Sequence, residues 1–176
     1  MIQRIVWFLV GSVFLVACQS CDQDKQRQRE VSRQLEPKQL IKTNKEKIDR
    51  ENKQIEGYVK RRGWEMEKSG TGLRYMVYDK GEGEKGKSGQ QVTIEYDVYL
   101  IHGEKVYSSE KGGPFTFEIG KANVESGLHE AMTYLRKGDK AHLVIPSYLA
   151  HGLTGDRNKI PGDATVIYDV QVLDLE

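Results

Sequence analysis

Six segments between Leu73 and the C-terminus are rich in valine, isoleucine, tyrosine and phenylalanine, and most of them alternate apolar with polar residues. A period of two places every second side chain on the same face of a β-strand. Most of these segments are bounded by glycine, aspartate or proline, which favour turns. The pattern predicts strands over residues 73–79, 91–100, 104–109, 114–119, 140–146 and 164–175.

One segment between these strands has a helical period instead. Residues 124–135 read VESGLHEAMTYL, which places five apolar side chains on one helical face, and Gly138 is expected to stop the helix. Residues 69–176 are also long enough to enclose a single hydrophobic core. We therefore expect an α+β domain in which one short helix packs against a mostly antiparallel sheet.

A second helix is predicted upstream of the sheet, over residues 37–62. Pro37 suits a first helical position, and Ile41, Ile48 and Ile55 recur every seven residues. Only one heptad position is consistently apolar, so the coiled-coil signal is weak. Two interpretations stay open: a solvated helix that lies against the following domain by its isoleucine stripe, or dimerisation through residues 37–62. Residues 37–68 are treated as a charged helix and linker.

The N-terminus has the pattern of a bacterial lipoprotein signal. Arg4 precedes an uncharged apolar run over residues 5–17, which is shorter than the roughly 20 residues that span a bilayer. The run ends in LVAC, similar to a lipobox, so we expect cleavage of residues 1–17 and lipidation of Cys18. The alternative is an ordinary signal peptide. Residues 18–36 are polar and predict a flexible tether, and Cys21 is left as a free thiol or an intermolecular bridge.

Charge gives no reason to expect nucleic acid as a partner. Residues 22–68 contain 14 Lys and Arg against 10 Asp and Glu, whereas residues 69–176 contain 12 against 16. Neither half has the strong basic excess of a nucleic-acid-binding domain.

Residues 81–88 read GEGEKGKS and match the pattern of a nucleotide phosphate-binding loop. Such a loop works because a helix N-terminus lies directly behind it, whereas here a strand follows. Glu82 and Glu84 would also repel phosphate. A metal-bound nucleotide also needs an aspartate at the end of a later strand, and the only candidate is Asp169, in a strand that looks like a half-polar edge strand. We therefore predict a turn that joins two antiparallel strands, and no nucleotide site.

The histidines do not predict a metal site. His102 lies in a predicted hairpin turn, His142 alternates within a predicted strand, and neither they nor His129 and His151 have a partner at zinc-ligand spacing. No nucleophile elbow of the G-x-S-x-G type is present. We expect neither a metal nor a cofactor.

Several motifs follow one another in the C-terminal domain. They are Gly81, Gly83 and Gly89 before VTIEY (92–96), PFTFEIG (114–120), VESGL (124–128), GDKAHLVIP (138–146), AHGLTG (150–155) and IPGDATVIYDVQVL (160–173). In this order they resemble the FKBP-type peptidyl-prolyl cis-trans isomerases, over residues 70–176. The resemblance implies an antiparallel sheet curved around a short helix, with rotamase activity on proline-containing client proteins, no cofactor, and binding of FK506-like macrolides.

The same resemblance implies a proline pocket and its residues. The backbone N–H of Glu125 would donate to a substrate carbonyl, and Tyr107 would lie at the rim. The lining would consist of Tyr96, Val106, Phe115, Val124, Leu128, His151, Ile160 and Tyr168.

Four of these positions depart from the family pattern, in which phenylalanine is usual at Val106, aspartate at Tyr107, tryptophan at Leu128 and tyrosine at His151. These departures motivate a second hypothesis, in which the domain binds clients as a chaperone or assembly factor with little turnover.

The N-terminal half adds a narrower resemblance. The lipobox, the charged helix and TGLRYMVYDKGEGEK (71–85) are similar to gliding-motility-associated FKBP-type lipoproteins. This implies a cell-envelope lipoprotein that faces the periplasm and takes part in folding exported proteins. Gln19 does not provide an aspartate retention signal after Cys18, which favours the outer membrane.

Overall fold

The computed structural model describes residues 37–176. The predicted signal peptide, the lipidated Cys18, Cys21 and the tether over residues 18–36 lie outside the described residues. The chain divides into two compact units, residues 1–48 and 49–176, and nearly all described elements belong to the second unit. Among the described residues, no helix combines the length and the apolar character that crossing a membrane would require.

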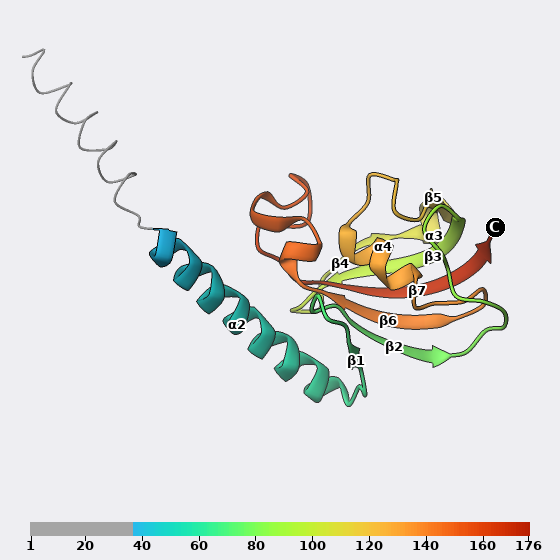
Figure 1. Cartoon of the computed structure of the whole chain (residues 1–176). Coiled ribbons are helices and arrows are strands. Elements are labelled where there is room, and N and C mark those ends of the chain that lie inside the picture. Colours follow the sequence, from blue (N-terminus) through green and yellow to red (C-terminus); the bar gives the residue numbers. More distant parts are fainter. Residues whose placement is uncertain (1–36) are drawn as a thin grey trace, which may run out of the picture. The chain divides into compact units, whose positions relative to one another are not determined.

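The second unit is built on one seven-stranded antiparallel sheet (Figure 1). The strand order is β1-β2-β6-β7-β3-β4, and β5 pairs with β3 beside this path. The strands are β1 (Glu67–Lys68), β2 (Arg74–Asp79), β3 (Gln91–Leu100), β4 (Lys105–Ser108), β5 (Phe115–Glu118), β6 (Lys140–Ile145) and β7 (Val166–Leu175). The expected α+β class and antiparallel pairing are confirmed.

The helices are α2 (Pro37–Arg62), α3 (Ser109–Gly112), α4 (Ser126–Met132) and the 3-10 turns η1 (Ser147–Leu149) and η2 (Gly152–Thr154). The predicted end of α2 at Arg62 is confirmed, and Pro37, the first described residue, is already helical. The prediction for α4 was too long at both ends. Its last turn closes where the Tyr134 amide donates to Ala131, and Leu135 reaches the core from the following turn. Gly138 does not end α4, but it does adopt a left-handed φ of 87°.

One expectation about the sheet was wrong. The strand that carries Asp169 is not an edge strand, because β7 lies between β6 and β3. Residues 81–88 join β2 to β3, which run antiparallel as expected, but β6 and β7 lie between these two strands in the sheet. Gly81 passes so close to the chain at Lys137 that a Cβ would lie 2.0 Å from its carbonyl oxygen.

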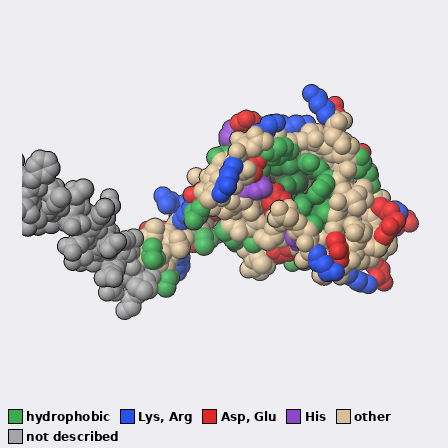
Figure 2. All heavy atoms as spheres, turned by 90° about the horizontal axis from the view of Figure 1, so that it is seen from above, with side chains coloured by type: hydrophobic (Ala, Val, Ile, Leu, Met, Phe, Trp, Pro, Cys, Tyr) green, Lys and Arg blue, Asp and Glu red, His purple; other side chains and the backbone are tan. Residues whose placement is uncertain are grey.

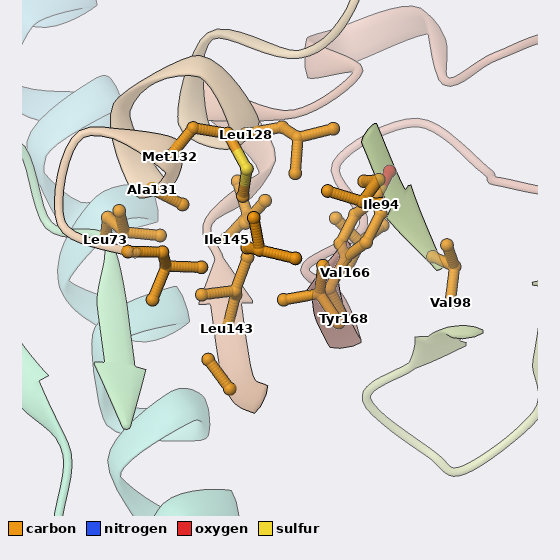
Figure 3. Packing of buried hydrophobic residues seen from close by; sticks show 14 of the residues in the cluster. Leu73, Ile94, Val98, Leu128, Ala131, Met132, Leu143, Ile145, Val166 and Tyr168 are labelled. Atoms are coloured by element: carbon orange, nitrogen blue, oxygen red, sulfur yellow. The ribbon is translucent and has the colours of Figure 1, made fainter. Parts of the chain in front are cut away.

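The main core lies between the concave face of the sheet and α4. Figure 3 shows Leu128, Ala131 and Met132 of α4 turned toward Leu143 and Ile145 of β6. Every second residue of β3 contributes to the same cluster, as its alternating pattern predicts.

A smaller core on the other face of the sheet includes the C-terminal part of α2. Ile55 and Tyr58 are buried there against Val144 and Ile167. Ile55, the last isoleucine of the predicted stripe, therefore packs against the sheet. Ile41, in the other unit, is 68% exposed.

Candidate functional site

A cavity of about 160 Å³ opens on the face of the sheet that carries α4. Figure 2 views the domain from this side and shows hydrophobic side chains gathered in a hollow, with charged side chains along its edge. Strands β3, β4, β5 and β7 and the start of α4 all contribute to the cavity wall. Its lining residues are Ile94, Tyr96, Val98, Tyr107, Phe115, Val124, Glu125, Leu128 and Tyr168.

The structure brings most of the predicted pocket residues together in this cavity. Val106 and Ile160 are not among the lining residues, and both side chains are buried in the main core, at 2% and 3% exposure. His151 is also not a lining residue, but its side chain contacts Glu125, which is a lining residue. Sequence reasoning missed Ile94 and Val98, whose alternation with Tyr96 could have identified them, since residues i and i+2 of a strand share a face.

Close packing of α4 against β6 places Val124, Glu125 and Leu128 at the cavity. The approach depends on Gly127, where a Cβ would lie 2.3 Å from Cγ2 of Ile145 and 3.2 Å from Cβ of Leu149. A residue larger than glycine would push α4 away from the sheet. The glycine of the VESGL motif is therefore required by the packing.

Aromatic rings form the mouth and one wall of the cavity. The Tyr96 ring lies edge-on to Phe115, with a centroid distance of 6.5 Å, and 6.1 Å from the Tyr168 ring. Phe115 in turn stacks on the buried Phe117 at 5.4 Å. Phe115 is nevertheless 40% exposed, so it offers a hydrophobic surface to a ligand at the entrance.

A carboxylate lies at the inner edge of this apolar wall. Oε1 of Glu125 accepts a hydrogen bond of 2.8 Å from the Tyr168 hydroxyl and lies 2.9 Å from Nε2 of His151. Burial, followed by the charge of Glu125, raises the pKa of Tyr168 well above its usual range. The hydroxyl therefore stays protonated and continues to donate to Glu125.

A second hydroxyl–carboxylate pair lies at the rim. The Tyr107 hydroxyl donates to Oδ2 of Asp156, whose Oδ1 accepts from the backbone amides of Asn158 and Ile160, both at 2.8 Å. Burial acts to raise the pKa of Asp156, but these hydrogen bonds outweigh it and lower the pKa. The hydrogen bond to Asp156 raises the pKa of Tyr107.

Asp156 is a site residue that sequence reasoning missed. The rim still contains an aspartate and a tyrosine, but Tyr107 stands where the family usually has aspartate, and the carboxylate comes from Asp156. Nothing in the local pattern of residues 150–160 indicated this, because the pair forms between positions 49 residues apart.

The other histidines do not line the cavity. The Gly120 amide donates to Nδ1 of His129 at 2.8 Å, and the His142 ring stacks on Trp64 with a centroid distance of 4.2 Å. His102 lies in the β3–β4 turn beside Glu104. Across residues 37–176, the structure brings no three His, Cys, Asp or Glu side chains together as a metal site would require.

A larger hollow of about 590 Å³ lies on the opposite face of the sheet, but its lining is dominated by charged and polar side chains, among them Glu95, Asp97, Glu110 and Lys140. The site beside α4 is smaller and combines aromatic and aliphatic walls with few polar groups, as small-molecule and peptide side-chain pockets do. We therefore take the cavity beside α4 as the candidate site.

Comparisons with known proteins agree with this fold and site. The family described as FKBP-type peptidyl-prolyl cis-trans isomerase matches residues 82–173. The FKBP-type peptidyl-prolyl cis-trans isomerase FkpA of Buchnera aphidicola is 35% identical over 138 residues, which are 78% of this chain and 55% of that protein. FK506-binding protein 2 of Dictyostelium discoideum is 37% identical over 92 residues, which are 52% of this chain and 69% of that protein.

The crystal structure of FkpA from Escherichia coli superposes with a TM-score of 0.64 at 28% sequence identity, and the match covers 94% of this chain and 82% of that one. In sequence, the chain spans about half the length of the FkpA proteins that it matches. The family match extends over more than half of the chain and includes β3 to β6 and all but the last two residues of β7. The chain therefore belongs to the FKBP-type peptidyl-prolyl cis-trans isomerase family.

Proposed function

We propose that this protein is a peptidyl-prolyl cis-trans isomerase that acts on proline-containing client proteins in the cell envelope. The observation that carries the proposal is the cavity beside α4, in which Tyr96, Phe115 and Tyr168 surround a space of about 160 Å³. A proline ring is of a size to enter this space. The same surface would bind FK506-like macrolides.

The chemistry requires no nucleophile or metal. Rotation about an X–Pro bond is slow because it breaks amide resonance, with a barrier of about 18–20 kcal/mol. In the twisted state the amide is less polar than in the planar state. A pocket that excludes water therefore favours the twisted state, and each factor of ten in rate requires about 1.4 kcal/mol. The Glu125 backbone N–H, just ahead of α4, is the proposed donor to a substrate carbonyl.

The test is a proline-peptide isomerisation assay on the parent protein and on Phe115→Ala. Because Phe115 is 40% exposed, its truncation should leave the fold intact while kcat/KM falls by about tenfold, the equivalent of ~1.4 kcal/mol. Tyr78→Ala is the matched control, since Tyr78 is an aromatic of similar exposure that lines the hollow on the opposite face. A parent protein without activity would refute the isomerase proposal.

A second candidate is a client-binding chaperone with little turnover. Its support is that Leu128 is smaller than the usual tryptophan and that His151 is engaged by Glu125. The pocket would then hold a client chain more than it accelerates rotation. Suppression of aggregation of a model client that survives Phe115→Ala would favour this candidate.

The remaining proposals concern location and assembly. The lipobox supports a lipid anchor on Cys18 and an outer-membrane lipoprotein facing the periplasm, and the likeness of the N-terminal half supports a role in gliding motility. Cys18→Ser should release the protein from membranes, whereas Cys21→Ser should not. Exposure of Leu40 and Ile41 on α2 supports weak dimerisation through residues 37–62, which sedimentation at rising concentration would detect.

A further inference from the structure

A carboxylate on α2, that of Glu51, is buried outside the lining of the candidate site. Glu51 is 9% exposed, and its two oxygens accept three hydrogen bonds: 2.6 Å from the Ser147 amide, 3.0 Å from the Ser147 hydroxyl and 2.7 Å from the Thr165 hydroxyl. Hydrogen bonds to an ionised acceptor are stronger than those between neutral groups, and they offset the cost of burying the charge. Glu51 is therefore a specific connection between α2 and the domain.

Ser147 begins the segment of the chain that leads to His151, next to the cavity. It is the first residue of η1, and its carbonyl accepts from the Ala150 amide, one residue before His151. His151 then contacts Oε1 of Glu125, a lining residue of the cavity. One route thus runs from Glu51 through η1 to the cavity.

A second route passes through α4. The Leu149 carbonyl, at the end of η1, accepts a hydrogen bond of 3.1 Å from the Ser126 hydroxyl. Ser126 is the first residue of α4 and directly follows Glu125, and Gly127 packs against Leu149. A displacement of η1 would therefore shift Glu125 both through His151 and through the start of α4.

We propose that Glu51 is a positioning residue for the proline pocket, and that α2 uses it to hold η1, His151 and the start of α4 in their working arrangement. This inference rests on the isomerase function proposed above. A misplacement of about 1 Å in such a site costs up to about a hundredfold in rate, so a contact remote from the cavity can still control turnover.

The chain offers a matched control on the same helix. Asn52 accepts a hydrogen bond of 3.1 Å from Nη2 of Arg74, a buried residue at the start of β2. This contact also joins α2 to the domain, but Asn52 bonds a side chain at the start of β2, whereas Glu51 bonds η1 itself. Loss of the Asn52 contact should weaken the docking of α2 without moving the pocket.

The experiment compares Glu51→Gln and Asn52→Ala in the full chain, at a temperature where both are folded. Glutamine preserves the shape of Glu51 but removes its charge, so that the hydrogen bonds with Ser147 and Thr165 become the weaker bonds of a neutral amide. We expect Glu51→Gln to lower kcat/KM for a proline peptide by about tenfold and to shift the ring resonances of His151 relative to those of the remote His102. Asn52→Ala should change neither quantity.

Equal kcat/KM in the two variants, with unshifted His151 resonances, would overturn the proposal and leave Glu51 a structural contact only. If Glu51→Gln does not fold, Ser147→Ala replaces it as the test, because this variant removes only the 3.0 Å hydroxyl contact. A smaller loss of kcat/KM together with a smaller shift of the His151 resonances would support the proposal. No change in either quantity would refute it. If the parent protein has no isomerase activity, the proposed function fails, and the His151 resonances alone decide whether Glu51 positions the pocket.

Discussion

At the residue scale, the interaction that recurs in this protein is a hydrogen bond from a tyrosine hydroxyl to a carboxylate. Two such pairs, Tyr107 with Asp156 and Tyr168 with Glu125, lie at the candidate site. Others stabilise the sheet: Tyr75 donates to Glu67 at 2.6 Å, and Tyr78 donates to Asp169 at 2.8 Å. A phenol bonded to a carboxylate holds its proton more tightly, because ionisation would break the bond and place two negative charges together.

These pairs predict a loss of stability at high pH. Burial, followed by the hydrogen bond to Asp169, raises the pKa of Tyr78 from 10.0 to about 12. Between these two values the unfolded chain binds fewer protons than the folded one, so this contribution is fully present below pH 10 and is lost as the pH rises toward 12. Urea unfolding of the parent and of Tyr78→Phe at pH 9 and pH 11.5 should show a smaller alkaline loss in the variant. An equal loss in both proteins would contradict the assignment.

At the element scale, the position of α4 decides the shape of the cavity. The helix has only the residues Ser126–Met132, and it is oriented by the apolar side chains it buries and by the close approach at Gly127. No side-chain hydrogen bond caps its N-terminus. The energy that holds α4 in place is therefore mainly that of packing.

Gly127→Ala should consequently be costly even though alanine is the better helix former. Its Cβ would overlap Cγ2 of Ile145 at 2.3 Å, and overpacking of a core typically costs about 1–3 kcal/mol. Denaturant unfolding at neutral pH should show this loss in the variant. Gly70→Ala is the control, because no atom lies within 4 Å of its added Cβ, and we expect it to be nearly neutral. If Gly127→Ala also left the stability unchanged, α4 would be able to shift away from the sheet without cost, and the packing argument would be wrong.

At the scale of the whole molecule, the domain extends further toward the N-terminus than the family match does. The match begins at residue 82, whereas the compact unit begins at Asp49 and includes the C-terminal part of α2. Ile55 is fully buried against this unit, and Glu51 connects it to η1. The last turns of α2 are therefore part of the folded domain.

Two truncations test this boundary. A fragment of residues 49–176 should unfold at nearly the temperature of the full chain. A fragment of residues 63–176 should be less stable by about 3 kcal/mol or more, because each buried side chain of the size of Ile55 or Tyr58 contributes about 1.5–3 kcal/mol. Calorimetry of the two fragments would measure the difference. Equal transition temperatures would place the domain boundary after α2.

Much of the fold was predictable because it follows from local chemistry. Alternation in β3 and the helical period of α2 each reflect which side chains must face a core, so type and bounds could be predicted from the residues alone. Expectations failed where the outcome depended on strand order. The strand that carries Asp169, β7, looked like an edge strand, because sequence shows where strands lie but not which of them pair.

The sequence by itself determined the α+β class, since this depends on residue type and spacing along the chain. Its motifs established the resemblance to the family, and that resemblance implied most of the residues that line the cavity. Tertiary structure alone decided that Asp156 supplies the carboxylate for Tyr107, that Glu125 joins His151 to Tyr168, and that Glu51 binds η1. Each of these contacts joins residues that lie between 26 and 96 positions apart along the chain. Hydrogen bonds act over about 3 Å in space, whatever the separation along the chain, so only the folded arrangement could identify these partners.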